Sequence, residues 1–529
     1  MGLCELPNEI ITEIIIESRP DGFENFLLTC KRFYYCGEHL IEHHNSLKSE
    51  LDVYNCNILD GSCCRSVSHL RDYCRLASNN LYARYVKTMD FNPHRSSPSQ
   101  YLGSNYLSME DNNLESEIIK QCVAESSYLR ISGANIETWQ RHILPYGSNI
   151  KIESHIAFTS TFLMTLLPNV KTILLPFGLE YAGPSSWPTY SSSEDLEVWE
   201  VMKVIRRNIE NNPNGAALRK LTRLYMVQND WYGPLFQMDT LYPFLALPNL
   251  TYLFANLCTA TKGTFSYEVP ISDMSSSLRT VELYHCFMNC EGVSQVLSKL
   301  PHLISFRYSN YGFRGESDFD AGGFVAAVGK QVGDRLEDLS VDICMHDGDI
   351  TTGVVSMDEF TKLKRLELDC RVFYGPSIES GERIGKDPKD PKPEYDKWTI
   401  QAIPSIYKIL PRSLERLDLY IWDHGIHPNP HVKGLKRLLK IREPISEGML
   451  PQLKVFRVGD LRGGHPYLDT KIENSEVFKY FQSCGVECEL SSGTTYPSWI
   501  KKLLRRLSKQ ATNSLEIPHS PYGPRNFQM

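Results

Sequence analysis

The chain has 529 residues and a formal net charge of −7 at pH 7, with 42% hydrophobic and 22% charged residues. This length and composition predict a globular protein of more than one domain, and the small net charge gives no electrostatic case for binding nucleic acid. No basic segment precedes an apolar one at the N-terminus, and no run of about eighteen apolar residues occurs, so we expect neither a signal peptide nor a membrane span. We therefore expect a cytoplasmic protein, a nuclear one or both, whose fifteen cysteines are reduced.

The first forty residues predict short amphipathic helices. Leu6-Pro7 is a favourable start for a helix, and Ile10 and Ile14 then recur at i, i+4 spacing. A second apolar stripe consists of Phe26, Leu27, Cys30, Phe33 and Tyr34. Helices this short cannot bury both stripes against one another, so the remaining apolar surface requires a partner.

The order Leu-Pro-x-Glu-Ile, an aliphatic helix, a short break and Leu-x-x-Cys-Lys-Arg-Phe resembles the F-box over residues 4–47. The F-box is a small helical module that docks on the Skp1 adaptor of cullin–RING ubiquitin ligases, so the resemblance implies a Skp1-like partner and, through it, a cullin. The residues that match the motif and would bind the adaptor are Leu6, Pro7, Glu9, Ile10, Ile14, Ile15, Leu28, Cys30 and Phe33. The chain departs from the motif at 17–21, where a second Leu-Pro is usual, and in having no Trp near residue 42. The alternative is an ordinary helical hairpin packed on the rest of the protein.

The pattern aliphatic-x-x-aliphatic-x-aliphatic recurs along the chain. Its copies begin at Val170, Leu221, Leu250, Leu278, Leu303, Leu336, Leu363, Leu414 and Leu453, with a weaker copy at Val86. A Leu-Pro pair stands just before five of them, at Leu167-Pro168, Leu247-Pro248, Leu300-Pro301, Leu410-Pro411 and Leu450-Pro451. A leucine that completes a helix face, a proline that stops the helix and aliphatic residues at period two predict a short strand after each helix.

The spacing of the copies predicts one strand and one helical return per unit. Successive copies from Leu221 to Leu363 begin 29, 28, 25, 33 and 27 residues apart. This arrangement resembles a leucine-rich-repeat solenoid. Two longer gaps of 51 residues, before Leu221 and before Leu414, contain either a degenerate repeat or an insertion. Helices are expected at Asp195–Asn211, Cys290–Leu300 and Phe324–Val332.

The predicted fold class is α/β, with an N-terminal helical F-box followed by an irregular leucine-rich-repeat-like solenoid of short parallel strands with helical returns. The expected divisions are an F-box at 1–50, a linking helical or irregular region with possible first degenerate repeats at 51–165, a solenoid with a C-terminal cap at 166–510 and a flexible tail at 511–529. Loops are expected at 93–113, 181–195 and 375–398. The basic amphipathic helix from Trp499 to Leu507 could bind a membrane surface or a partner, and we favour the interpretation that it caps the last repeat.

The sequence predicts no catalytic site. It has no G-x-x-x-x-G-K-S/T, G-x-G-x-x-G, H-E-x-x-H or G-x-S-x-G motif. The spacing of His424, His427 and His431 could hold a metal ion, but Pro428 and Pro430 prevent a shared helix face and favour a polar loop. We therefore expect no enzyme activity, no cofactor and no metal site.

The strand residues that alternate with the aliphatic positions point away from the predicted core, and we expect them to form an exposed target-binding surface. Their mixture of charged and aromatic side chains is typical of protein interfaces, although solubility alone would also favour polar residues there. They are Arg223, Tyr225, Tyr252, Phe254, Glu282, Tyr284, Arg307, Asp338, Arg365, Glu367, Arg416, Asp418, Tyr420 and Arg457.

Together these features predict a non-catalytic substrate-recognition subunit of an SCF-type (Skp1–cullin–F-box) ubiquitin ligase, similar to the F-box proteins with leucine-rich-like repeats of filamentous fungi. Its partners would be a Skp1-like adaptor and an unknown target protein. The alternative is a leucine-rich-repeat scaffold that is not linked to ubiquitination.

Overall fold

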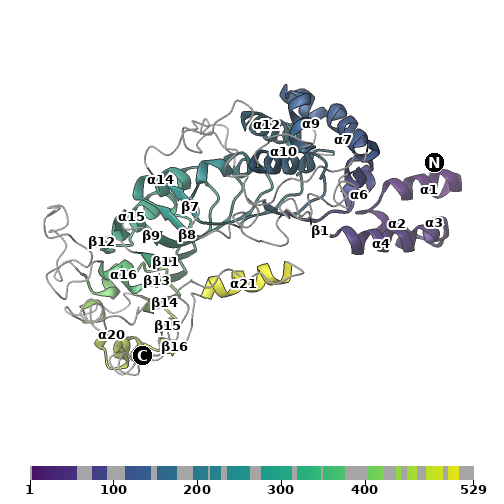
Figure 1. Cartoon of the computed structure of the whole chain (residues 1–529). Helices are drawn as coiled ribbons and strands as arrows, with labels where there is room; N and C mark the ends of the chain where they lie inside the picture. The colour runs from purple at the N-terminus through teal and green to yellow at the C-terminus, as the bar shows by residue number, and fades with distance from the viewer. Residues whose placement is uncertain are drawn as a thin grey trace, which may run out of the picture. The chain divides into compact units, whose positions relative to one another are not determined.

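The computed structural model describes residues 3–55, 74–91, 113–144, 152–175, 195–211, 215–227, 235–261, 276–312, 318–346, 350–375, 403–421, 437–441, 450–460, 472–491 and 498–510. The chain is mixed α/β (Figure 1). It divides into two compact units. Unit 1 comprises Met1–Asn229 and Ala246–Leu250, and unit 2 comprises Asp230–Leu245 and Thr251–Met529. The loops expected at 93–113, 181–195 and 375–398 and the tail at 511–529 lie almost entirely outside the described residues.

Unit 1 begins with the short helices that the sequence predicts and continues with four strands and further helices. The N-terminal elements are η1 (Leu3–Glu5), α1 (Asn8–Glu17), α2 (Phe23–Thr29), α3 (Lys31–Gly37), η2 (Glu38–Leu40) and α4 (Ile41–Leu51). They are followed by β1 (Val53–Asn55), α6 (Asn80–Tyr85), β2 (Thr88–Asp90), α7 (Asn113–Glu125), α8 (Ser127–Ser132), α9 (Ile136–Ile143), α10 (Ile152–Thr165), β3 (Thr172–Leu175), α12 (Asp195–Asn211) and β4 (Arg223–Met226). In the described part of unit 1 the strands pair in the order β1-β2-β3-β4, and each pair is parallel.

Unit 2 alternates strands and helices for most of its length. Its first half contains β5 (Phe236–Gln237), η5 (Met238–Leu241), α13 (Tyr242–Leu245), β6 (Tyr252–Asn256), β7 (Cys258–Ala260), β8 (Thr280–Met288), α14 (Cys290–Ser298), β9 (Ser305–Gly312), β10 (Phe319–Asp320) and α15 (Ala321–Val332). Its second half contains β11 (Asp338–His346), β12 (Ile350–Thr352), β13 (Arg365–Asp369), α16 (Cys370–Tyr374), α17 (Ile406–Ile409), β14 (Arg416–Ile421), β15 (Val455–Asp460), α20 (Glu476–Ser483), β16 (Glu487–Ser491) and α21 (Ser498–Gln510).

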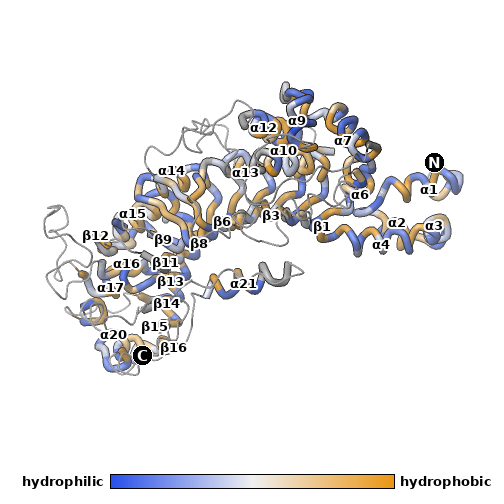
Figure 2. The backbone as a smooth tube through the Cα atoms, viewed as in Figure 1, coloured by the Kyte–Doolittle hydropathy of each residue, from blue (hydrophilic) through white to orange (hydrophobic). Residues whose placement is uncertain are grey.

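The main strands of unit 2 form one parallel array in the order β6-β8-β9-β11-β13-β14-β15-β16. In the strands from β6 to β15, the residues at the pattern positions, which we call the frame residues, are buried, as the repeating pattern predicts. The central frame residues are Leu253, Val281, Phe306, Leu339, Leu366, Leu417 and Phe456. In Figure 2 apolar segments follow the strands in both units. The expected α/β class, with parallel strands and intervening helices, is therefore confirmed.

The helices α14, α15, α16 and α20 of unit 2 pack on the frame side of this array. Phe324 of α15 stacks on Tyr308 of β9 at 4.5 Å between ring centroids, and Phe481 of α20 meets Phe456 of β15 at 5.2 Å. Gly292 allows α14 to approach β7 closely, because a Cβ there would overlap the carbonyl of Ala260. Figure 1 shows α14, α15 and α16 on this side of the strands and α21 on the other.

Four of the five Leu-Pro pairs stand just after a described helix, and all five precede a strand. α10, α13, α14 and α17 each end one or two residues before such a pair, and each pair precedes a strand of the parallel arrays. Asn289 and Asp320 begin the next helices, since their side chains accept hydrogen bonds from the backbone N–H groups of Gly292 and Gly323. The predicted helix at Asp195–Asn211 is α12, and the other two predicted helices correspond to α14 and α15.

The strands on either side of each long gap between repeats are direct neighbours. β3 pairs directly with β4, and β13 pairs directly with β14, so no strand of a further repeat lies between the members of either pair. The described residues of the first gap include α12, and those of the second include α16 and α17.

Candidate interaction surfaces

The N-terminal helices α1, α2 and α3 enclose a small core of their own. Its buried members are Ile11, Ile15, Phe23, Leu27 and Phe33. Gly37, the last residue of α3, allows Leu27 and Ile15 to pack closely against the helix backbone. A Cβ at this position would overlap the side chain of Leu27 and come within 3.1 Å of Ile15. In Figure 2 hydrophilic and hydrophobic residues alternate along these helices, as expected for elements with one buried face.

Arg32 ties α3 to the segment that precedes α1. Its guanidinium donates to the carbonyl of Leu6 at 2.7 Å, to the carbonyl of Cys4 and to Oδ1 of Asn8 at 2.7 and 3.0 Å. A planar guanidinium can serve several acceptors at once, so this one side chain fixes the position of residues 4–8. The sequence contained Arg32 within the Cys-Lys-Arg-Phe signature, but nothing in the pattern indicated its role.

The same helices leave large apolar side chains open to solvent. Eight large hydrophobic residues are exposed in the described part of the chain, and five of them lie in residues 3–35. These five, which we call the exposed apolar set, are Leu3, Ile10, Leu28, Tyr34 and Tyr35. Leu28 is 81% exposed and Tyr35 is 67% exposed. Such a concentration in a module whose core is already complete is typical of a surface that binds another protein.

The residues predicted to bind an adaptor divide into three groups. Pro7, Glu9, Ile10 and Leu28 are exposed, whereas Leu6, Ile14 and Cys30 are partly buried. Ile15 and Phe33 are buried in the core at 0% and 2% exposure. The expectation that these last two form part of the binding surface is therefore corrected: they hold the helices together. Leu3, Tyr34 and Tyr35 are the exposed apolar residues that the predicted set omitted.

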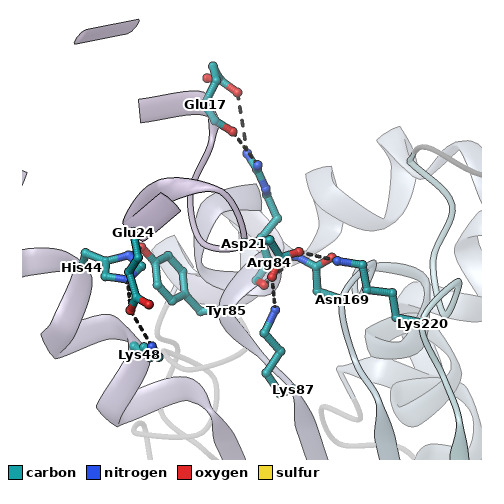
Figure 3. A network of polar contacts seen from close by, with 10 residues as sticks. All are labelled: Glu17, Asp21, Glu24, His44, Lys48, Arg84, Tyr85, Lys87, Asn169 and Lys220. Atoms are coloured by element: carbon teal, nitrogen blue, oxygen red, sulfur yellow. Dashed lines mark hydrogen bonds and ion pairs between the residues drawn. The ribbon is translucent and has the colours of Figure 1, made fainter. Parts of the chain in front are cut away.

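A polar network joins the N-terminal helices to the strands of unit 1 (Figure 3). Asp21 accepts hydrogen bonds from Lys87 at 2.6 Å and from Lys220. Burial raises the pKa of Asp21, but the hydrogen bonds from the two lysines outweigh this effect and lower the pKa below its usual value. Arg84 donates to the backbone carbonyl of Glu17 at 2.6 Å. These contacts orient the N-terminal helices relative to β2 and β4.

His44 lies at the centre of the second part of this network. Its ring stacks on Phe23 at 4.3 Å between centroids, and its Nδ1 forms a 2.6 Å hydrogen bond with the Tyr85 hydroxyl. Nε2 lies 3.5 Å from Glu24, which also accepts from Lys48 at 2.6 Å (Figure 3). Burial lowers the pKa of His44 and outweighs the opposite effect of Glu24, so the ring packs in its neutral form at neutral pH.

In unit 2 the strand residues that alternate with the frame residues lie on the other face of the parallel array. On neighbouring strands they stand side by side and form rows across the array. In the central row Glu282 lies beside Arg307, followed by Ser340, Glu367, Asp418, Arg457 and Glu489. Many of these side chains pair with one another. Arg307 contacts Glu282 at 2.7 Å and also Asp338, Arg416 contacts Asp418 at 2.7 Å, and Arg457 donates to Glu489 at 2.6 Å.

The expectation that these residues form an exposed surface is largely wrong. Tyr225, Tyr252, Phe254, Glu282, Tyr284, Glu367, Asp418 and Tyr420 are buried. Arg307, Asp338, Arg416 and Arg457 are partly buried, and Arg223 and Arg365 are exposed. Two physical causes are visible: the charged residues pair along the rows, and α21 covers part of the face. Parallel arrays are commonly covered on both sides, so alternation along a strand does not imply exposure.

The predicted position of α21 is also corrected. The ring of Trp499 meets that of Tyr284 of β8 at 6.2 Å, and Ser498 donates to Glu367 of β13 from its backbone N–H at 2.7 Å and from its hydroxyl at 3.0 Å. These contacts lie in the middle of the array and not on β16, its last strand. α20 packs beside β15 and β16 instead.

A second set of buried charges lies on the same face. Arg371 binds Asp369 through Nε and Nη2, with a shortest distance of 2.7 Å, and also donates to the carbonyl of Ile343. Asp342 is fully buried and accepts one hydrogen bond, from Ser309 at 3.1 Å. Burial and the neighbouring Asp369 raise the pKa of Asp342 to about 7. The face therefore holds carboxylates whose charge is costly in this environment.

No protein-family model matches the chain, and no curated protein matches it. Among the helices that the structure describes, none is both long and apolar enough to cross a bilayer. In the same described ranges, no group of three or more His, Cys, Asp or Glu side chains is arranged to hold a metal ion. The three histidines at 424, 427 and 431 lie outside the described residues.

Proposed function

We propose that the chain is a non-catalytic substrate-recognition subunit of an SCF-type ubiquitin ligase, in which α1–α3 are an F-box that binds a Skp1-like adaptor. The parallel array of unit 2, with its intervening helices, is in this proposal an irregular leucine-rich-repeat-like solenoid that captures the target protein. The chain would act by proximity: a target lysine held near a charged conjugating enzyme reacts within the complex instead of after a random encounter.

The observation that carries the proposal is the exposed apolar set on helices whose core is already complete. Burial of one large apolar side chain contributes about 1.5–3 kcal/mol. Association costs about 4–15 kcal/mol in lost translational and rotational freedom. Five such residues together can offset a cost in this range, whereas a single exposed residue elsewhere in the chain cannot.

The network around Asp21 and His44 supports the same proposal. An adaptor-bound module is useful to a ligase only if the rest of the receptor is held in a defined orientation relative to it. Asp21, Glu17 and His44 all contact residues of α6 or of the segments just before β2 and β4. These contacts would transmit the position of the adaptor to unit 1.

The test is a pull-down of the full chain with purified Skp1. The variant Ile10→Asp with Leu28→Asp places two charges within the exposed apolar set, and neither residue belongs to the buried core of the N-terminal helices. We expect it to lose roughly 100-fold in affinity, because interface anchors contribute about 2 kcal/mol or more each. The matched control is Leu114→Asp with Ile131→Asp, which charges two exposed residues on α7 and α8 and should leave Skp1 binding unchanged.

Two results would refute the proposal: no binding of Skp1 to the wild-type chain, or equal binding by the Ile10→Asp, Leu28→Asp variant. Either would favour the alternative of a repeat scaffold that is not linked to ubiquitination.

A further inference from the structure

The helix α21 lies on the face of the parallel array opposite to the one covered by α14, α15, α16 and α20. Tyr284 and Glu367, which it contacts, alternate with the frame residues Leu283 and Leu366 along β8 and β13. Since successive strand residues point to opposite faces, α21 and the helices α15 and α20 cover opposite sides of the array. α21 therefore occupies the face that the sequence assigned to target binding.

The residues of the array that contact α21, which we call the seat of α21, include a carboxylate and aromatic rings. Glu367 places a carboxylate at the first residue of the helix, where it accepts from the backbone N–H and hydroxyl of Ser498. Tyr420 also hydrogen-bonds Glu367. Trp499 is buried with its ring edge against Tyr284, and Ile500 and Leu503 are buried on the same stripe of the helix. The seat therefore combines the carboxylate of Glu367 with the aromatic rings of Tyr284 and Tyr420.

The contact has two unfavourable features. The Trp499 Nε1 is buried and has no hydrogen-bond partner within the described residues, and an unsatisfied buried donor costs about 1–3 kcal/mol. Burial raises the pKa of Glu367 and disfavours its charged form, an effect that the hydrogen bonds from Tyr420 and Ser498 offset only in part. Permanent core contacts rarely leave a donor such as the Trp499 Nε1 unsatisfied.

The strands do not depend on α21 for their pairing. β8, β9, β11, β13 and β14 are hydrogen-bonded to one another in register. Release of α21 would leave this array intact. The helix itself has five basic residues and no acidic one among its thirteen residues, so it is strongly basic.

We infer that α21 is an exchangeable occupant of this face, and that the face takes a short basic amphipathic helix with an aromatic residue in its first turn. A segment of a partner protein with the same chemistry would bind by displacing α21, which keeps the face closed until then. This inference rests on the proposed function only in regarding that partner as the target of a ligase.

The experiment uses the full chain and a synthetic peptide with the sequence of Ser498–Gln510. The peptide is acetylated, so that the N–H of its first residue is retained, and carries a fluorescent label at its C-terminus. In the variant Trp499→Ala the chain's own α21 loses its aromatic contact with Tyr284. We expect the variant to bind the peptide roughly tenfold or more tightly than the wild-type chain, as measured by fluorescence anisotropy.

Three further variants make the test specific. Ser498→Pro removes both hydrogen bonds to Glu367, while proline remains compatible with the first turn of a helix, and it too should expose the face. Lys502→Ala changes an exposed residue of α21 and should behave like wild type. Glu367→Gln, added to Trp499→Ala, alters the seat itself and should reduce peptide binding again by about tenfold.

The inference is overturned if the peptide binds neither released variant, or binds them no more tightly than it binds the wild-type chain while their unfolding transitions remain cooperative. In that case α21 is a fixed part of the fold. Loss of the cooperative transition in both variants would overturn it equally, since an exchangeable helix can leave without unfolding the array. Skp1 binding should be the same in all of these variants, so failure here is distinguishable from failure of the proposed function.

Discussion

Apolar and polar residues alternate both in the N-terminal helices of unit 1 and in the strands of unit 2. In the two regions, however, the residues turned away from the core differ in their exposure to solvent. In the helices the core is complete with five buried residues, and Leu28 and Tyr35 remain exposed. In the strands the polar and aromatic residues turned away from the frame are mostly buried, including Glu282 and Tyr284. Alternation therefore fixes the direction in which a side chain points, and the contacts made later by other segments decide whether it meets water.

The largest predicted effect separates the two kinds of residue within α3. Phe33→Ala should destabilise the N-terminal helices by about 3–5 kcal/mol, because it empties the centre of their core. Tyr35→Ala, two residues further on, should change stability by less than about 0.5 kcal/mol, because Tyr35 is exposed. Hydrogen exchange of the amides of α1–α3 measures both. Equal protection in the two variants would contradict the division into core and surface.

A smaller effect tests the buried charges of unit 2. The native pKa of Asp342, about 7, lies above its unfolded value near 3.8, so the native state binds a proton that the unfolded state has lost between these two values. Stability should therefore fall as the pH rises from about 4 to about 7, by an amount on the order of 2–4 kcal/mol. Asp342→Asn should remove this dependence and stabilise the chain at pH 8.

Urea unfolding at pH 5 and pH 8 provides the measurement. Asp369, Arg371 and Glu367 face the same site and should keep their contributions in the variant. Asp358→Asn, at an exposed position, is the control and should follow the wild-type pH profile. A profile unchanged by Asp342→Asn would show that this carboxyl is not the group that titrates.

A third prediction concerns the order of the segment before α1. Arg32→Ala should destabilise residues 4–8 by about 1–2 kcal/mol, since three acceptors lose their donor. Arg32→Lys should recover only part of this, because an ammonium cannot serve the three acceptors with the geometry of a planar guanidinium. Proteolysis near the N-terminus reports the change, and full recovery by lysine would contradict the role given to the guanidinium.

The smallest effect is expected at the contact between the N-terminal helices and the strands. Asp21→Asn should cost less than about 1 kcal/mol, because the pairs with Lys87 and Lys220 are partly exposed and screened by solvent and salt. The substitution should instead loosen the orientation of the N-terminal helices relative to the rest of unit 1. The distribution of distances between labels on α3 and α12 should therefore broaden. An unchanged distribution would mean that the remaining contacts suffice.

The sequence predicted the parallel strands and their helices because the signals lie within each repeat. These signals are the aliphatic frame residues, the Leu-Pro pair that ends a helix and a helix cap such as Asn289. It could not predict that Ser498 meets Glu367, since no local signal connects two residues so distant in the chain. The amphipathic stripe of α21 indicated a helix with one buried face but not which surface buries it. In the same way, the spacing of Ile15 and Phe33 placed them on apolar stripes, and only the packing of α1 against α3 determined that they are core residues.

The central claim is that the exposed apolar set is a docking surface for a Skp1-like adaptor. Titration calorimetry of the full chain with purified Skp1, repeated at several temperatures, tests it most directly, because burial of apolar surface on binding gives a negative heat-capacity change. The account predicts saturable binding with a negative heat-capacity change, lost in the Ile10→Asp, Leu28→Asp variant and retained in the Leu114→Asp, Ile131→Asp control. Absence of binding by the wild-type chain, or the same dissociation constant and heat-capacity change in both variants, would contradict it.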